Sequence, residues 1–169
     1  MGPTPSAPAD ARVAPAVLRG VLREVPTAVT VVTAATGRGP AGLTVGSFVS
    51  VSLRPPLIGV FIDEESTSWR EMRTSPTFAV NVLAGGQQEL CARFASSGTD
   101  KFAGLSFDTS PSGNPLLPGA AAWLDCRVED IRRLGDHDFA LARVTALGSA
   151  AAAAGSAVVF HRGALTSLG

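Results

Sequence analysis

Residues 42–63 read GLTVGSFVSVSLRPPLIGVFID, and this stretch decides the fold. Its first half places four small hydroxyl side chains around Gly46, and Pro55-Pro56 then interrupts it. The four hydroxyls belong to Thr44, Ser47, Ser50 and Ser52. Glycine lets a backbone approach a ligand closely, and small hydroxyls with free N–H groups can bind an anion. The same pattern is typical of an ordinary β-hairpin with polar turn residues, so both interpretations stay open.

Apolar and β-branched runs on both sides of this stretch predict strands. Residues 28–35 are dense in valine and threonine, and a turn cluster at 36–40 leads into residues 41–47, which predicts a hairpin. The run at 57–62 is too short for a helix and too apolar to be half exposed, so we expect a buried strand. Further strands are expected at 77–83, 120–134, 139–147, 157–160 and 164–168.

Three short helices are predicted between these strands. Apolar side chains recur at helical spacing over residues 17–25 until Pro26, which predicts an amphipathic helix packed on the next elements of the chain. Capping hydroxyls at 66–68 precede a helix over 69–73, and residues 87–94 form the third. The alanine run at 150–154 is either a helical turn or a loose connector. The elements lack the regular alternation of a parallel sheet, so a mainly β, closed or partly closed antiparallel barrel fits best.

Composition narrows the class of protein. The chain has 169 residues, enough for one domain, and 14 basic residues balance 14 acidic ones. Without a charged block we expect neither a nucleic-acid nor a membrane partner, and small molecules or proteins remain. Cys91 and Cys126 lie far apart, so we expect buried free thiols and no metal site. Residues 1–15 lack the features of a signal peptide and are predicted as a disordered arm before a domain over 16–169, in the cytoplasm.

Separated motifs succeed one another in a fixed order along the chain. They are residues 30–33, residues 42–52 with Pro55-Pro56, FAVNVL at 78–83, Asp100-Lys101-Phe102, AWLDC at 122–126 and Gly135-Asp136-His137. In this order and spacing the chain resembles the short-chain flavin reductases of the flavin-reductase-like, FMN-binding split-barrel family. The resemblance extends from about residue 17 to residue 168.

The resemblance implies an antiparallel Greek-key split β-barrel with a few helices, which forms a homodimer with a flavin groove near the subunit interface. It also implies an NAD(P)H-dependent reductase that transfers hydride to FAD or FMN and supplies reduced flavin to a partner monooxygenase. These residues are compatible with either FAD or FMN, and with either NADH or NADPH. The alternatives are a flavin-binding module that does not reduce flavin, and a split-barrel oxidase with its own small substrate, for which the chain has few basic residues.

Two groups of site residues are implied by the resemblance. Those implied to line the isoalloxazine are Thr44, Val45, Gly46 and Ser47, and those implied to reach the ribityl chain and phosphate are Ser50, Val51 and Ser52. A Ser-Val-Ser turn offers hydroxyls and main-chain N–H groups to a phosphate without a basic side chain. Position 46 is glycine where many family members have Asn or Ser. Near the C-terminus, Ala164 follows Gly163 at a position where family members often have a larger residue.

The segment from Asp63 through Ser66 to Ser68 opens a helix whose hydroxyls and amides could add phosphate donors, with the carboxylates of Asp63, Glu64 and Glu65 turned away from the ligand. Simple helix capping is the alternative.

A flavin reductase needs little acid–base catalysis because the cofactors carry the chemistry and the protein holds them stacked.

Four further residues are candidates for cofactor contacts. His137, on the Gly135-Asp136-His137 tip of a long hairpin, is the candidate catalytic residue at the nicotinamide or the flavin edge, or else it satisfies turn hydrogen bonds. Lys101 could meet the flavin phosphate and Phe102 could face a ring, or they are a solvated lysine beside a core phenylalanine. Arg162 could neutralise a nucleotide phosphate or pair with a surface carboxylate.

Overall fold

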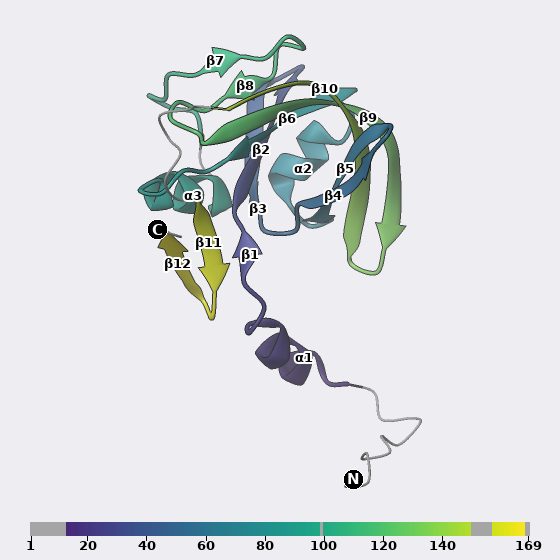
Figure 1. Ribbon diagram of the computed structural model, residues 1–169, viewed down its shortest axis with the longest axis vertical. Coiled ribbons are helices and arrows are strands. Elements are labelled where there is room, and N and C mark those ends of the chain that lie inside the picture. The colour runs from purple at the N-terminus through teal and green to yellow at the C-terminus, as the bar shows by residue number, and fades with distance from the viewer. Residues whose placement is uncertain (1–12, 99, 150–156, 168–169) are drawn as a thin grey trace, which may run out of the picture.

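A single seven-stranded antiparallel sheet forms the centre of the computed structural model, which describes residues 13–98, 100–149 and 157–167 (Figure 1). Its strands are β2 (Thr30–Thr36), β3 (Gly39–Val45), β4 (Val49–Leu53), β5 (Pro56–Asp63), β6 (Thr77–Val82), β9 (Ala122–Leu134) and β10 (His137–Ser149). Their order is β3-β2-β6-β9-β10-β5-β4, so β3 and β4 are the edges. The predicted mainly antiparallel fold is confirmed, and the barrel is open because its two edge strands do not pair among the described residues.

Two small sheets complete the β structure. The first joins β1 (Thr27–Ala28), β11 (Val158–His161) and β12 (Ala164–Ser167), and the second pairs β7 (Asp108–Thr109) with β8 (Pro115–Leu116). The predicted strand over 28–35 is therefore divided between two sheets. Val29, at the division, donates its N–H to the Val158 carbonyl and accepts a bond from the Leu83 N–H. The alanine run at 150–154, predicted as a helical turn or a connector, lies outside the described residues, as do residues 1–12 of the predicted arm.

The three helices are α1 (Pro15–Leu22), α2 (Thr67–Met72) and α3 (Gln88–Ala95), close to the predicted positions. Helix α2 lies within the curve of the sheet and buries Trp69 and Met72, whereas α3 packs near the C-terminal hairpin and buries Cys91 and Phe94 (Figure 1). Side chains alternate along a strand, so β2 serves both cores. Val32 packs in the core with α2, and Val31 packs in the core with α3.

Helix α1 departs from the prediction because none of its residues is buried. Its apolar side chains Val17, Leu18, Val21 and Leu22 are all exposed, and it lies away from the main body (Figure 1). The expectation that it packs on the following elements of the same chain is wrong, since α2 and α3 already cover the two cores. Within the described ranges, no helix is long and apolar enough to cross a membrane.

A buried polar network fixes the segment between α3 and β9. The Asp125 carboxylate is fully buried and accepts bonds from the Ser110 hydroxyl (2.8 Å), the Ser112 N–H (2.9 Å) and the Asn114 amide (3.1 Å). Burial, with the charge of Asp125, raises the pKa of the neighbouring Cys126 thiol to about 12. Cys91 and Cys126 are both buried and form no disulfide, as predicted.

Candidate functional site

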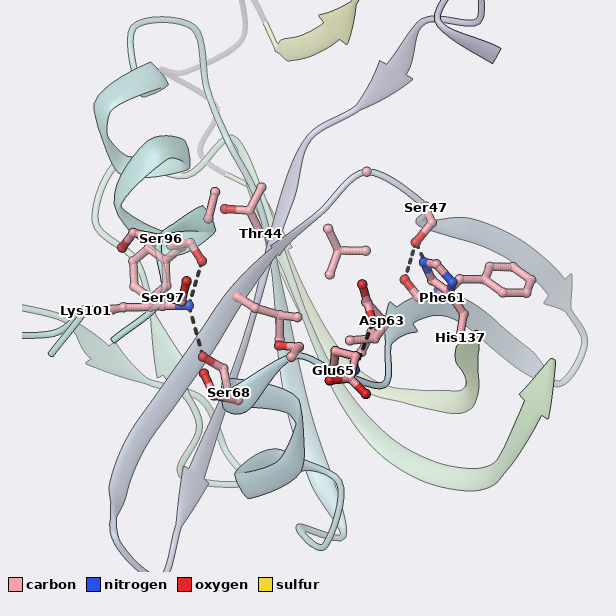
Figure 2. Close-up of a pocket in the computed structure, with 18 of the residues that line it drawn as sticks. Thr44, Ser47, Phe61, Asp63, Glu65, Ser68, Ser96, Ser97, Lys101 and His137 are labelled. Atoms are coloured by element: carbon pink, nitrogen blue, oxygen red, sulfur yellow. Dashed lines mark hydrogen bonds between the residues drawn. The ribbon is translucent and has the colours of Figure 1, made fainter. Parts of the chain in front are cut away.

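A groove with a volume of about 720 Å³ opens between β3, β5, α2, α3 and the start of β10 (Figure 2). The residues that line it are Thr27, Leu43–Ser47, Phe61–Asp63, Glu65–Ser68, Phe94–Ser97, Lys101 and His137. Lys101 and Ser68 lie at one end of the groove, and Phe61 and His137 lie at the other (Figure 2). The size is that of an ordinary small-molecule or cofactor site.

The four residues predicted for the isoalloxazine, Thr44 to Ser47, all line the groove. The Thr44 hydroxyl donates to the Cys91 carbonyl (2.8 Å), which ties β3 to α3. A Cβ on Gly46 would lie 3.2 Å from the Thr27 hydroxyl oxygen, so the chain has little room for a side chain here. The backbone of this segment, more than its side chains, is therefore what a ligand would meet.

The Ser47 hydroxyl continues the sheet just before the start of β4. It donates to the Phe61 carbonyl (2.6 Å) and accepts from the Phe61 N–H (3.1 Å). These are the two bonds that a neighbouring strand would make with Phe61. Ser47 thus holds the β3–β4 corner against β5, where Phe61 itself faces the groove.

Ser50, Val51 and Ser52 lie outside the lining of the groove, on the edge strand β4. The interpretation of these residues as a turn is wrong, because the connection to β5 is made at Arg54 and Pro55. Ser50 pairs with Ile58 and Ser52 with Leu57, so Val51 is the extra residue of a β-bulge. The Ser52 hydroxyl accepts a bond from the Arg54 N–H (3.2 Å).

Lys101 supplies the positive charge of the groove. Its ammonium donates to the Phe94 carbonyl (2.8 Å), the Ser68 hydroxyl (3.0 Å) and the Gly42 carbonyl (3.1 Å), so three elements converge on it. All three acceptors are neutral, and no described carboxylate forms an ion pair with it. Burial without such a partner lowers the pKa of Lys101. A cation without a counter-ion is suited to an anionic ligand.

A second cavity of about 390 Å³ shares Thr67, Ser68 and Lys101 with the groove. Phe102 lines this second cavity and not the groove itself. Its ring is buried and meets the Phe94 ring edge to face, with centroids 5.1 Å apart. Phe102 therefore packs in the core of this chain, which is the alternative interpretation of this residue.

The residues from Asp63 to Ser68 line the groove except for Glu64, but their polar groups bond mainly within the segment and to α2. The Asp63 carboxylate accepts from the Glu65 N–H (2.8 Å), and the Ser66 hydroxyl accepts from the Trp69 N–H (3.3 Å). The Ser66 bond is that of a helix N-cap, the Asp63 bond closes the turn before it, and α2 has only six residues. Within this chain the segment therefore caps the helix, as the alternative interpretation has it. The Ser68 hydroxyl accepts a bond from the Lys101 ammonium.

His137 begins β10 directly opposite Asp63 and lines the groove. Its Nδ1 lies 2.7 Å from an oxygen of Asp136, and this hydrogen bond lowers the pKa of the Asp136 carboxyl. The imidazole is partly exposed, at the end of the groove that also presents Phe61 (Figure 2). The tip histidine is thus held by its neighbour and available to a ligand.

Arg162 lies away from the groove, in the turn between β11 and β12. Its Nε donates to the Glu24 carboxylate (2.8 Å), and its N–H donates to the Arg23 carbonyl (3.1 Å). Within this chain the surface-carboxylate alternative therefore holds. The bonds attach the segment after α1 to the C-terminal hairpin.

Sequence reasoning missed ten lining residues, which are Thr27, Leu43, Phe61, Ile62, Glu65, Thr67 and residues 94–97. Phe61 lies in the run expected to be too apolar for exposure, yet its neighbour Ile62 faces the core while Phe61 is 37% exposed. Strand alternation was the available signal, because it places consecutive residues on opposite faces.

Comparisons with known proteins agree with one another. The family model described as flavin reductase like domain matches residues 22–169. A flavin reductase of Pseudomonas putida is 42% identical over 146 residues, covering 86% of this chain and 85% of that protein. The reductase subunit of a flavin-dependent monooxygenase from Mycobacterium tuberculosis is 35% identical, covering 94% of this chain and 85% of that protein. An NADH:FAD oxidoreductase of Streptomyces globisporus, solved with NAD and FAD fragments, has a TM-score of 0.84 and 34% identity over 91% of this chain and 92% of that one.

Proposed function

The chain belongs to the flavin reductase like family, and we propose that it uses the groove to reduce FAD or FMN with NADH or NADPH. It is an NAD(P)H:flavin oxidoreductase of the kind that supplies reduced flavin to a partner monooxygenase. The observation that carries the proposed site is the groove itself, with Lys101, which pairs with no described carboxylate, at one end and His137 at the other.

The residues of the groove fit a flavin. The phosphate would lie near the Lys101 ammonium, which no described carboxylate neutralises. The isoalloxazine would lie along Thr44, Val45, Gly46 and Ser47, which line the groove. A phosphate contact of Ser50, Val51 and Ser52 stays a prediction, since these residues lie outside the lining.

The bound cofactors supply the chemistry, which is direct hydride transfer from nicotinamide C4 to flavin N5. The part of the protein is to hold the two rings at roughly 3 to 3.5 Å and to keep water from between them. Phe61 and the half-exposed His137 form the end of the groove where the nicotinamide would enter. His137 orients it there by hydrogen bonding and transfers no proton.

We expect His137→Ala to raise the KM for NADH about tenfold, the effect of losing one to two kcal/mol of binding, and to change the flavin affinity less. The matched control is His161→Ala, since His161 lies on β11 and outside the groove. Steady-state kinetics with NADH varied at saturating flavin measures the effect. Unchanged NADH kinetics in His137→Ala would remove His137 from the site.

The alternative of a flavin-binding module is separated from a reductase by one assay. We expect purified protein to oxidise NADH only when FMN or FAD is added. Tight flavin binding without any NADH oxidation would support the binding module instead. Running the assay with NADPH in parallel decides the nicotinamide, and comparing FMN with FAD decides the flavin.

A homodimer is a further part of the proposal, and it is supported by α1. An eight-residue helix is marginal in water on its own, yet α1 exposes Val17, Val21 and Leu22. A second copy of the chain would cover this face. We expect light scattering to give a dimer, and a Val21→Glu variant to give more monomer; a monomeric wild-type protein would contradict the proposal. A cytoplasmic location stays a prediction from the sequence.

A further inference from the structure

The tip of the β9–β10 hairpin is fastened to the corner between β5 and α2. The Glu64 N–H donates to the Asp136 carbonyl (3.3 Å), and the Glu64 carboxylate pairs with the Arg133 guanidinium. Asp136 directly precedes His137. The backbone that carries the candidate catalytic residue is therefore attached to the wall of the groove through Glu64.

Arg133 makes a second contact to the same tip. Its Nε donates to the Gly135 carbonyl (2.6 Å), and Gly135 has a left-handed φ of 68°. One guanidinium thus spans the turn of the hairpin and the carboxylate on the neighbouring corner, because two different nitrogens of its planar set of donors make the two contacts. We call Arg133 and Glu64 the tip clamp.

The clamp is poorly placed to stabilise the fold. The side chains of Arg133 and Glu64 are 48% and 33% exposed, and exposed ion pairs contribute little to the free energy of unfolding. The long ladder between β9 and β10 already fixes the hairpin up to the pair of Leu134 with His137. On its other side β10 pairs with β5 as far as His137 and Asp63, so the backbone of His137 is held by both ladders. What the clamp adds is a fixed position of Gly135 and Asp136 in the turn, and the Asp136 carboxylate holds the His137 imidazole.

We propose that Arg133 is a positioning residue, which holds the hairpin tip through Glu64 and Gly135 so that His137 faces the nicotinamide. This inference rests on the proposed role of His137. Without the clamp, the turn gains freedom, and the imidazole occupies its place at the groove for a smaller fraction of the time. The loss falls on NADH binding, because the Lys101 end of the groove is formed by other elements.

Arg132 provides a matched control on the same strand. It pairs with Asp130 two residues away, and among the described residues no hydrogen bond or ion pair joins it to the tip or to Glu64. Its side chain is exposed, as that of Arg133 is. Arg132→Met therefore removes the same charge from the same hairpin without releasing the tip.

The experiment compares Arg133→Met, Glu64→Gln, Arg132→Met and His137→Ala by NADH kinetics, flavin titration and thermal unfolding. We expect Arg133→Met and Glu64→Gln to raise the KM for NADH about fivefold, with flavin affinity and Tm near those of the wild type. Arg132→Met should behave as the wild type. Adding Arg133→Met to His137→Ala should change the KM no further, because both act through one group.

Two outcomes separate the failures. If His137→Ala raises the KM and Arg133→Met does not, the clamp is overturned and the proposed function stands. If His137→Ala leaves the KM unchanged, the role of His137 and the clamp inference both fail, although NADH oxidation by the wild type still identifies a reductase. An equal loss in Arg132→Met and Arg133→Met would also overturn the clamp, since it would reflect charge alone.

Discussion

Replacing Lys101 by methionine is expected to raise the dissociation constant of FMN roughly tenfold to a hundredfold, the range for a lost hydrogen bond to a charged group. Lys101 is the only Lys or Arg side chain among the described residues that line the groove. Its ammonium is held in place by Phe94, Ser68 and Gly42, so it is ordered before a ligand arrives. Fluorescence titration of FMN against each protein measures the change.

Riboflavin is the control ligand for this prediction because it lacks the phosphate. We expect it to bind wild type and Lys101→Met with similar affinity. If FMN binding were unchanged in the variant, the phosphate would not lie at Lys101. If both ligands were lost together, the substitution would have disturbed the groove through the three hydrogen bonds of the ammonium, and the charge assignment would be contradicted.

The pH dependence of FMN binding is set by the same residue. Burial lowers the pKa of Lys101, and only the protonated amine attracts phosphate. FMN affinity should therefore fall as the pH rises through this lowered pKa, and Lys101→Met should remove that decline. Between the lowered pKa and the unfolded value the unfolded chain binds more protons, so the contribution of this group to the free energy of unfolding rises with pH. Affinity and stability should thus change in opposite directions.

Replacing Asp138 by alanine is expected to lower the free energy of unfolding by about 3 kcal/mol. The Asp138 carboxylate is 3% exposed, accepts from the Trp69 indole N–H (2.8 Å) and lies 3.5 Å from the Arg73 guanidinium. It joins α2 to β10 beneath the groove. Its removal leaves the buried indole N–H without an acceptor and frees one wall of the site.

Two further variants control this prediction, and urea unfolding measures all three. Asp138→Asn keeps an acceptor for Trp69 and should lower the free energy of unfolding by less than Asp138→Ala does. Asp130→Ala removes a surface carboxylate paired with Arg132 and should lower the free energy of unfolding by under about 0.5 kcal/mol. Equal losses for Asp138→Ala and Asp130→Ala would contradict the buried bond.

Much of the fold could be predicted because local patterns and tertiary packing agree. The β2–β3 hairpin is predicted by valine and threonine runs around a turn cluster, and α2 is predicted by its Ser66 cap. The unpacked α1 could not be predicted, since its amphipathic pattern says only that one face needs a partner. The missed strand β4 has two prolines after it that displace the turn from the serines to residues 54–55.

The site was partly predictable for a related reason. Residues 44–47 and His137 carry recognisable motifs and line one groove. The sequence could not show which polar side chains bond within the protein and which are left for a ligand, because this depends on partners far along the chain. Ser47 bonds to Phe61, Thr44 to Cys91, and Arg162 to Glu24. The Glu64–Arg133 contact likewise joins residues that lie far apart in the chain.

The central claim, that one groove brings a nicotinamide and a flavin together, is tested most directly by mixing the protein with flavin and NADH without oxygen. We predict that the visible absorbance of the oxidised flavin disappears with one NADH consumed per flavin, and much more slowly in His137→Ala at limiting NADH. A flavin that stays oxidised on the protein in the presence of excess NADH and NADPH would contradict the account.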